Sequence, residues 1–84
     1  MTENNISQQI KSVIAAECGM KKKNLNNKTG FMADKSLSFF NCMDVLYTLE
    51  HKFHVSLPEA DFYKYNTVGD LTKNIVKQLK VRSR

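Results

Sequence analysis

The sequence has little of several residue types that mark particular protein classes. Its 84 residues include no Trp, one Pro, three Gly and two Cys. Two cysteines are too few for a disulfide framework, and both fall within expected helices, so we expect Cys18 and Cys42 to be reduced core residues of a cytoplasmic protein. No apolar run approaches the roughly 18 residues that span a bilayer. The polar start, Thr2 to Asn5, predicts that there is no signal peptide.

Charge is present but unevenly spread. Residues 1–35 carry six Lys and three acids, residues 36–70 two Lys and five acids, and residues 71–84 five basic residues and no acid. The net charge of +5 therefore comes from basic flanks around a mildly acidic middle. Lys73, Lys77 and Lys80 share one helix face, and Lys21 to Lys23 with Lys28 form another basic cluster. No nucleic-acid-binding motif accompanies them, so solvated faces are favoured and a small basic nucleic-acid-binding domain is the third choice of function.

The length predicts one domain over residues 1–84, with its core at about 6–79. Its clearest helical pattern lies between Ser36 and Phe53. One apolar stripe has the spacing of a core-facing helix: Cys42, Val45, Leu46, Leu49 and Phe53. A second stripe, rotated around the helix, is Phe39, Phe40, Met43 and Tyr47. The chain has little other apolar material to cover that second stripe, so we weigh extra core and a partner-binding surface equally.

Similar spacing predicts two further long helices. The first runs from about Asn5 to Cys18, with Gly19 as its C-terminal stop. The last runs from a capping box at Thr67–Asp70 to about Lys80, and residues 81–84 are expected to fray.

Two shorter segments connect these helices. Pro58 to Lys64 is expected to form a short helix, with Pro at its first position. Met20 to Lys35 reads as a loop of about 16 residues, which is long for a compact domain and needs apolar anchors. The candidate anchors are Leu25, Phe31 and Met32. The resulting fold class is all-α, a four-helix bundle of three longer helices and one short helix with a long first loop.

Two motifs in this order resemble those of the acyl carrier protein family. Leu49-Glu50-His51-Lys52-Phe53-His54-Val55-Ser56-Leu57-Pro58 is similar to the family's Leu-Glu-Glu-x-Phe-x-Val/Ile-x-Ile/Leu-Pro. Thr67-Val68-Gly69-Asp70-Leu71 is similar to its Thr-Val-Gly-Asp-Leu/Ala. The resemblance covers about Ile6 to Leu79 without a gap. It implies the family's bundle, in which helix 1, a long loop, a central helix, a short helix and a last helix follow one another.

The resemblance also implies a site at the start of the central helix. There the family carries a Ser, within Asp-Ser-Leu, whose hydroxyl receives a 4′-phosphopantetheine arm from coenzyme A. Counting forward from Phe31 or backward from Leu49 puts Phe39 at this position, and a phenyl ring has no oxygen with which to form the phosphodiester. The favoured hypothesis is therefore an unmodified interaction module without a cofactor. The alternatives are a working carrier with phosphopantetheine on Ser38, one position earlier, or on Ser36, which requires a three-residue insertion.

Partner binding is assigned by the same resemblance. Its partner-facing positions are Phe40, Met43 and Tyr47, enlarged by Phe39 and rimmed by Asp44 and Glu50. The implied partners are acyl-processing or biosynthetic enzymes of fatty-acid or polyketide-like metabolism, bound by a monomer. His51 and Lys52 stand where the family commonly has acids, so partners that are steered by an acidic surface should bind less well. Alternatively, and with equal weight, Phe39 turns inward and fills the space that an acyl chain would occupy in a carrier.

No catalytic or metal site is predicted. His51 and His54 lie three residues apart without the further ligands that a metal needs, so they are interpreted as surface histidines. Cys42 lies on the core stripe with no evident base beside it. The chain also lacks a Gly-rich phosphate loop and a paired-carboxylate signal, so we expect that it is not an enzyme.

Overall fold

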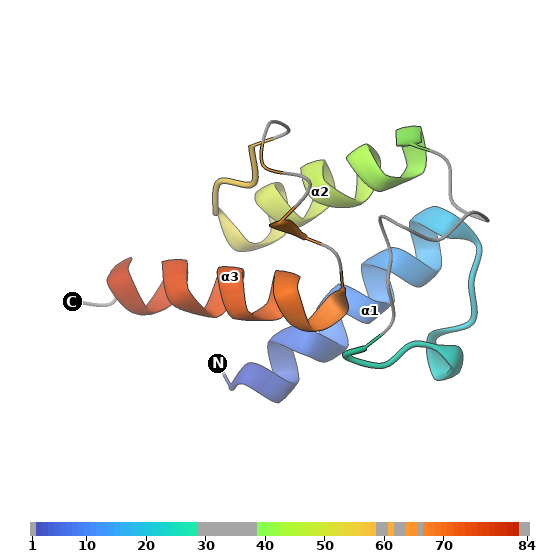
Figure 1. The fold of residues 1–84 in the computed structure, drawn as a ribbon, viewed down its shortest axis with the longest axis horizontal. Coiled ribbons are helices and arrows are strands. Elements are labelled where there is room, and N and C mark those ends of the chain that lie inside the picture. The colour runs from blue at the N-terminus through green and yellow to red at the C-terminus, as the bar shows by residue number, and fades with distance from the viewer. Residues whose placement is uncertain (1, 29–38, 59–60, 62–63, 66, 83–84) are drawn as a thin grey trace.

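The computed structural model describes residues 2–28, 39–58, 61, 64–65 and 67–82, and for residues 39–41 and 82 it describes the backbone only. Three long helices make up most of it: α1 (Glu3–Cys18), α2 (Phe39–Phe53) and α3 (Val68–Arg82). In Figure 1, α1 runs obliquely to α3, and it packs against both α2 and α3. The predicted all-α fold class is confirmed.

The ends of α1 are set by Thr2 and Gly19. The Thr2 hydroxyl accepts a hydrogen bond from the Asn5 backbone N–H at 3.1 Å, so the helix starts at Glu3, two residues before the predicted start. Gly19 has a φ of 67°, in the left-handed region, and its N–H donates to the Ala15 carbonyl. The predicted stop at Gly19 is therefore confirmed, and its cause is the freedom of glycine to adopt positive φ.

The start of α3 is a reciprocal capping box. The Asp70 N–H donates to the Thr67 hydroxyl at 3.1 Å, and the Thr67 N–H donates to the Asp70 carboxylate at 3.2 Å. This confirms the predicted cap. The far end differs from the prediction, because Val81 and Arg82 belong to the helix instead of to a frayed tail. No Gly or Pro follows Gly69 in the sequence, so nothing local stops the helix earlier.

The connection from α1 to α2 is more structured than a simple loop. It contains a short 3₁₀ helix, η1 (Lys22–Asn24), which the sequence analysis did not predict. Leu25 follows it and is 6% exposed, so its predicted role as an apolar anchor is confirmed. The other two predicted anchors, Phe31 and Met32, lie outside the described residues.

A polar anchor at Asn27 also holds this connection. The Asn27 side-chain oxygen accepts from the buried Ser7 hydroxyl of α1 at 2.7 Å. Its backbone carbonyl accepts from the Gly69 N–H at 2.9 Å, at the start of α3. Asn27 therefore joins α1 to α3, and a Cβ at Gly69 would lie 2.9 Å from the Asn27 carbonyl oxygen.

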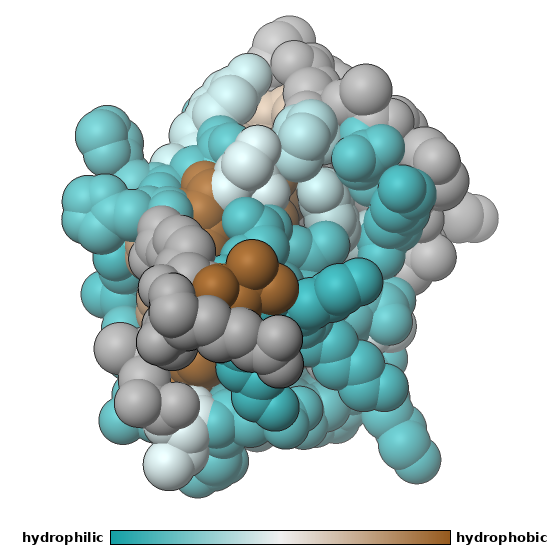
Figure 2. Space-filling view, turned by 90° about the vertical axis from the view of Figure 1, so that its left-hand side faces the viewer, coloured by the Kyte–Doolittle hydropathy of each residue, from teal (hydrophilic) through white to brown (hydrophobic). Residues whose placement is uncertain are grey.

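One core serves all three helices. Its most buried large side chains include Ile6, Ile10 and Ile14 of α1, Leu46 and Leu49 of α2, and Leu71 and Ile75 of α3. Leu57 and Tyr65, from the connection between α2 and α3, complete the core. Figure 2 shows one outer face, on which mostly hydrophilic residues surround a small apolar area.

The connection from α2 to α3 is also held in place. His54 has a φ of 55°, which turns the chain out of α2. A helical turn follows, because the Asp61 N–H donates to the Pro58 carbonyl at 3.0 Å, and Lys64 lies 3.7 Å from the Asp61 carboxylate. The rest of the predicted short helix, Pro58 to Lys64, lies outside the described residues.

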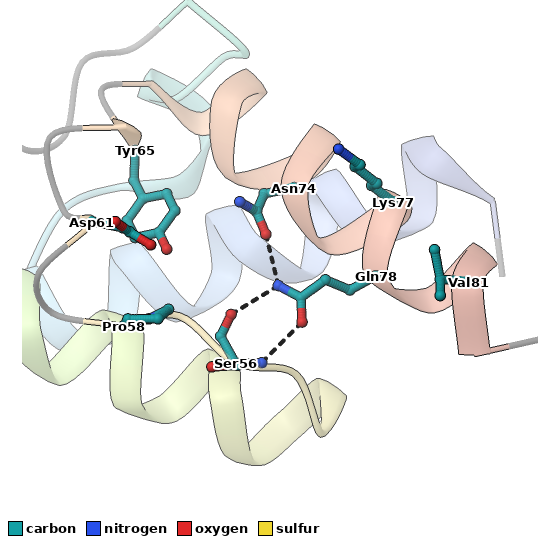
Figure 3. A pocket seen from close by; sticks show the side chains of 8 residues that line it. All are labelled: Ser56, Pro58, Asp61, Tyr65, Asn74, Lys77, Gln78 and Val81. Atoms are coloured by element: carbon teal, nitrogen blue, oxygen red, sulfur yellow. Dashed lines mark hydrogen bonds between the residues drawn. The ribbon is translucent and has the colours of Figure 1, made fainter.

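Gln78 of α3 ties this connection down (Figure 3). Its amide donates to the Ser56 carbonyl at 2.8 Å and accepts from the Ser56 N–H at 3.0 Å, so one side chain satisfies both backbone groups. The same amide nitrogen donates to the Asn74 side chain at 2.7 Å, one turn earlier in α3. The segment that leaves α2 is therefore fixed to α3 by hydrogen bonds as well as by burial.

Candidate functional site

The core-facing side of α2 is the stripe that the sequence predicted. Its members are at most 5% exposed: Cys42, Val45, Leu46, Leu49 and Phe53. Burial of this stripe fixes which residues of α2 point outward. It also leaves Cys42 inaccessible, and neither Cys42 nor Cys18, both within described helices, forms a disulfide.

The outward side of α2 carries Asp44, Tyr47 and His51, which we call the α2 face. All three are exposed, and at spacings of three and four residues they lie along one side of the helix. Tyr47 is 52% exposed, which is unusual for a large aromatic residue. A shallow hollow of about 430 Å³ lies beside Tyr47, Glu50 and His51. The α2 face thus offers an aromatic ring beside a carboxylate and an imidazole side chain.

Met43 does not belong to this surface, so its predicted exposure is wrong. It is 5% exposed and is part of the core. Met43 neighbours Cys42 in sequence and Leu46 one turn on, both of which are buried. A flexible thioether side chain fills irregular gaps beside such residues, so the buried side of α2 is wider than one stripe.

The position that the family resemblance assigns to attachment lies at the beginning of α2. Phe39 is the first residue of α2 and Phe40 the second. Their side chains, predicted to bind partners, lie outside what the structure describes, and so do both alternative attachment residues, Ser36 and Ser38.

Glu50 has a role that the sequence analysis missed. Its carboxylate accepts a hydrogen bond at 2.8 Å from the Leu57 N–H, beyond the turn at His54. The prediction placed Glu50 only at the rim of a partner surface. In the sequence, Glu50 simply precedes Leu57 by seven residues. The two groups meet only because the chain turns at His54 after leaving α2. Glu50 holds the end of α2 to the next segment.

A second hollow, of about 520 Å³, lies between that segment and α3 (Figure 3). Its lining is Ser56, Pro58, Asp61, Tyr65, Asn74, Lys77, Gln78 and Val81. Tyr65 is 2% exposed, and burial, followed by the carboxylates of Asp61 and Glu50, raises the pKa of its hydroxyl. The hydroxyl therefore stays protonated and is a poor nucleophile.

Neither a metal-binding cluster nor a membrane-spanning helix is present in the described part of the chain. Across the described ranges, no three His, Cys, Asp or Glu side chains are grouped so that they could hold a metal ion. None of the helices in the described part of the chain is long and apolar enough to cross a membrane.

Comparison with known proteins bears on α2. Residues 8–75 match the family described as "Phosphopantetheine attachment site". An acyl carrier protein from Chlamydia caviae is 27% identical over 67 residues, covering 80% of this chain and 87% of the relative. Another, from Chlorobium phaeobacteroides, is 27% identical over 78 residues, covering 93% of this chain and all of the relative. The matched range includes the whole of α2 and reaches Ile75 in α3.

Proposed function

This chain belongs to the acyl carrier protein family, defined by its phosphopantetheine attachment site, and from that premise we propose that it recognises partner proteins without carrying the arm. Proteins of this family are carriers and not catalysts, so the proposal includes no catalytic residue. The proposed partners are acyl-processing or biosynthetic enzymes. In this proposal the chain carries no 4′-phosphopantetheine.

The start of α2 is the observation on which the proposal rests. The helix spans 15 residues from Phe39 to Phe53, and Phe53 is the Phe of the family-like Leu-Glu-x-x-Phe motif. The gap-free resemblance, counted back from Leu49 or forward from Phe31, supports the proposal that Phe39 stands where the family has its modified Ser. Transfer of the arm requires a hydroxyl oxygen that attacks phosphorus, and Phe39 offers none.

The α2 face supports the second half of the proposal. Tyr and other aromatic side chains are enriched among the residues that dominate binding energy at protein interfaces. Tyr47 is exposed between Asp44 and His51 and is not one of the core residues. We propose that Tyr47 is the central contact, with Phe39 and Phe40 extending the surface toward the helix start.

The arm is tested by intact mass after incubation with coenzyme A and a broad-specificity phosphopantetheinyl transferase. We expect no gain in mass for the wild-type chain and a gain of one phosphopantetheine for Phe39→Ser, because that variant restores only the missing hydroxyl. A gain in the wild type, mapped to Ser38 or Ser36 and lost in the matching Ser→Ala variant, would replace the proposal with a carrier that has a displaced attachment point.

The surface is tested against purified acyl-processing enzymes by calorimetry. Truncating a residue that dominates an interface costs 2 kcal/mol or more, so we expect Tyr47→Ala to weaken binding by about 30-fold. Gln8→Ala is the control, since Gln8 is exposed on α1 and is not part of the α2 face. An equal effect of both variants, or none from Tyr47→Ala, would remove the α2 face from the proposal.

A further inference from the structure

A further groove, which shares Lys77 and Val81 with the hollow beside Ser56, runs between the start of α1 and the outer side of α3. It has a volume of about 400 Å³. Its lining residues are Glu3, Lys73, Val76, Lys77, Lys80 and Val81. No residue of α2 lines it, so it is distinct from the α2 face.

The lysines of this groove are not neutralised within the described protein. Lys73, Lys77 and Lys80 are exposed, and none of them is within ion-pair distance of an acidic group among the described residues. At spacings of four and three residues, like charges on a helix repel one another. The helix dipole favours Lys80 near the C-terminus of α3, but it gives no such benefit to Lys73 in the second turn. A negatively charged group bound beside Lys73, Lys77 and Lys80 would therefore reduce the repulsion among them.

The groove also has an apolar floor. Val76 is half-buried and packs against the core, while Val81 is 65% exposed. An apolar floor with a lysine rim is complementary to a segment that has acidic and apolar side chains on adjoining faces.

From these contacts we propose that the groove docks an acidic amphipathic segment of a partner protein. Its carboxylates pair with Lys73, Lys77 and Lys80, and an apolar side chain rests on Val76 and Val81. Glu3 repels negative charge at its own end of the groove and so orients the segment. The proposal does not depend on the α2 face or on the arm.

The same features disfavour other anionic occupants. Single-stranded nucleic acid binds through stacking on aromatic side chains, and no aromatic residue lines this groove. A membrane surface rewards insertion of several large apolar residues, whereas Val81 is the groove's one well-exposed apolar side chain. A protein segment makes use of both the lysines and the floor.

The test is fluorescence anisotropy with a labelled synthetic peptide of about 16 residues, roughly four helical turns, carrying Glu on one face and Leu on the next. We expect Lys73→Glu combined with Lys77→Glu to weaken binding by about tenfold or more. The matched control is Lys21→Glu combined with Lys22→Glu, which makes the same charge change at two exposed lysines near η1. It should weaken binding by less than about twofold, since charges outside the contact area mainly change the rate at which the partners associate.

A second variant separates the possible occupants. Val81→Asn replaces the exposed apolar side chain of the floor by a polar one and should weaken binding of the peptide. Circular dichroism checks that each variant is folded. Single-stranded DNA of equal charge and phosphatidylglycerol vesicles serve as comparison probes. The proposal is overturned by equal losses in the two double variants, by the absence of peptide binding to wild type, or by tighter binding of DNA or vesicles that Val81→Asn leaves unchanged.

Discussion

α2 and α3 are both 15 residues long and both pack on α1, yet they are held and exposed differently. α2 is held mainly by a wide apolar side that takes in Met43, and it presents Tyr47 to solvent. α3 adds specific hydrogen bonds at both ends, through its capping box and through Gln78 on Ser56. Its outer side presents lysines. Two helices of one bundle can therefore share a core while offering surfaces suited to different partners.

The core that both helices share should show the largest effect. Leu49 of α2 is 0% exposed, so Leu49→Ala should lower the free energy of unfolding by about 2–5 kcal/mol through lost burial and a residual cavity. Urea denaturation followed by circular dichroism measures it. Tyr47→Ala, two residues away and half exposed, should change stability by no more than about 0.5 kcal/mol. Similar losses in the two variants would contradict the assigned inner and outer sides of α2.

Gly69→Ala tests how closely the start of α3 packs against Asn27. Replacing a helical Gly by Ala ordinarily stabilises by up to about 1 kcal/mol. Here the added methyl would lie 2.9 Å from the Asn27 carbonyl oxygen, so we expect a net destabilisation of about 1–3 kcal/mol in the same denaturation measurement. Lys73→Ala, exposed on the same helix, should be nearly neutral. A more stable Gly69→Ala protein would show that Asn27 does not approach α3 so closely.

The end of α2 depends on one carboxylate, so Glu50→Ala should have a smaller effect. It leaves the Leu57 N–H without its partner, at a cost of about 1 kcal/mol. Glu50→Gln keeps a side-chain oxygen that can accept the bond and should recover part of the loss. Asp44→Ala, exposed on the same helix, is the control. If the two Ala variants unfold at the same urea concentration, the bond contributes nothing measurable.

Tyr65, in the connection between the two helices, should show the smallest effect and only in alkali. Its raised native pKa means that the folded protein keeps the proton where the unfolded chain begins to lose it. The stabilisation is complete below the unfolded pKa of about 10 and is lost as pH rises through the native pKa. The fall in unfolding free energy from about pH 9 to pH 11 should therefore be steeper for wild type than for Tyr65→Phe, and parallel curves would refute this.

Much of the fold could be read from the sequence because its signals are local. The stop at Gly19, the capping box at Thr67 and Asp70, and the inner stripe of α2 each depend on residues within a turn or two of one another. The early start of α1 and the late end of α3 were missed. The start of α1 depends on a Thr2 cap that was not recognised. The end of α3 is later than predicted because no Gly or Pro interrupts the helix after Gly69.

The candidate site was only partly predictable. The outer position of Asp44 followed from helical spacing, whereas Tyr47 was left open between core and surface and is exposed in the structure. The burial of Met43 was misjudged and the hydrogen bond of Glu50 was missed, because both depend on distant neighbours. Met43 is buried by how the bundle closes around it, and Glu50 is engaged by a backbone N–H whose position depends on the turn at His54.

By itself the sequence determined the helices, their caps and the family, because helical period and short motifs are properties of neighbouring residues. It also determined that Phe39 brings no hydroxyl to its position. Tertiary structure alone decided that Asn27 would join α1 to α3, that Gln78 would hold Ser56, and that Glu3 and the lysines of α3 would line one groove. Those contacts join residues far apart in the chain, and only packing around a common core fixes such distances.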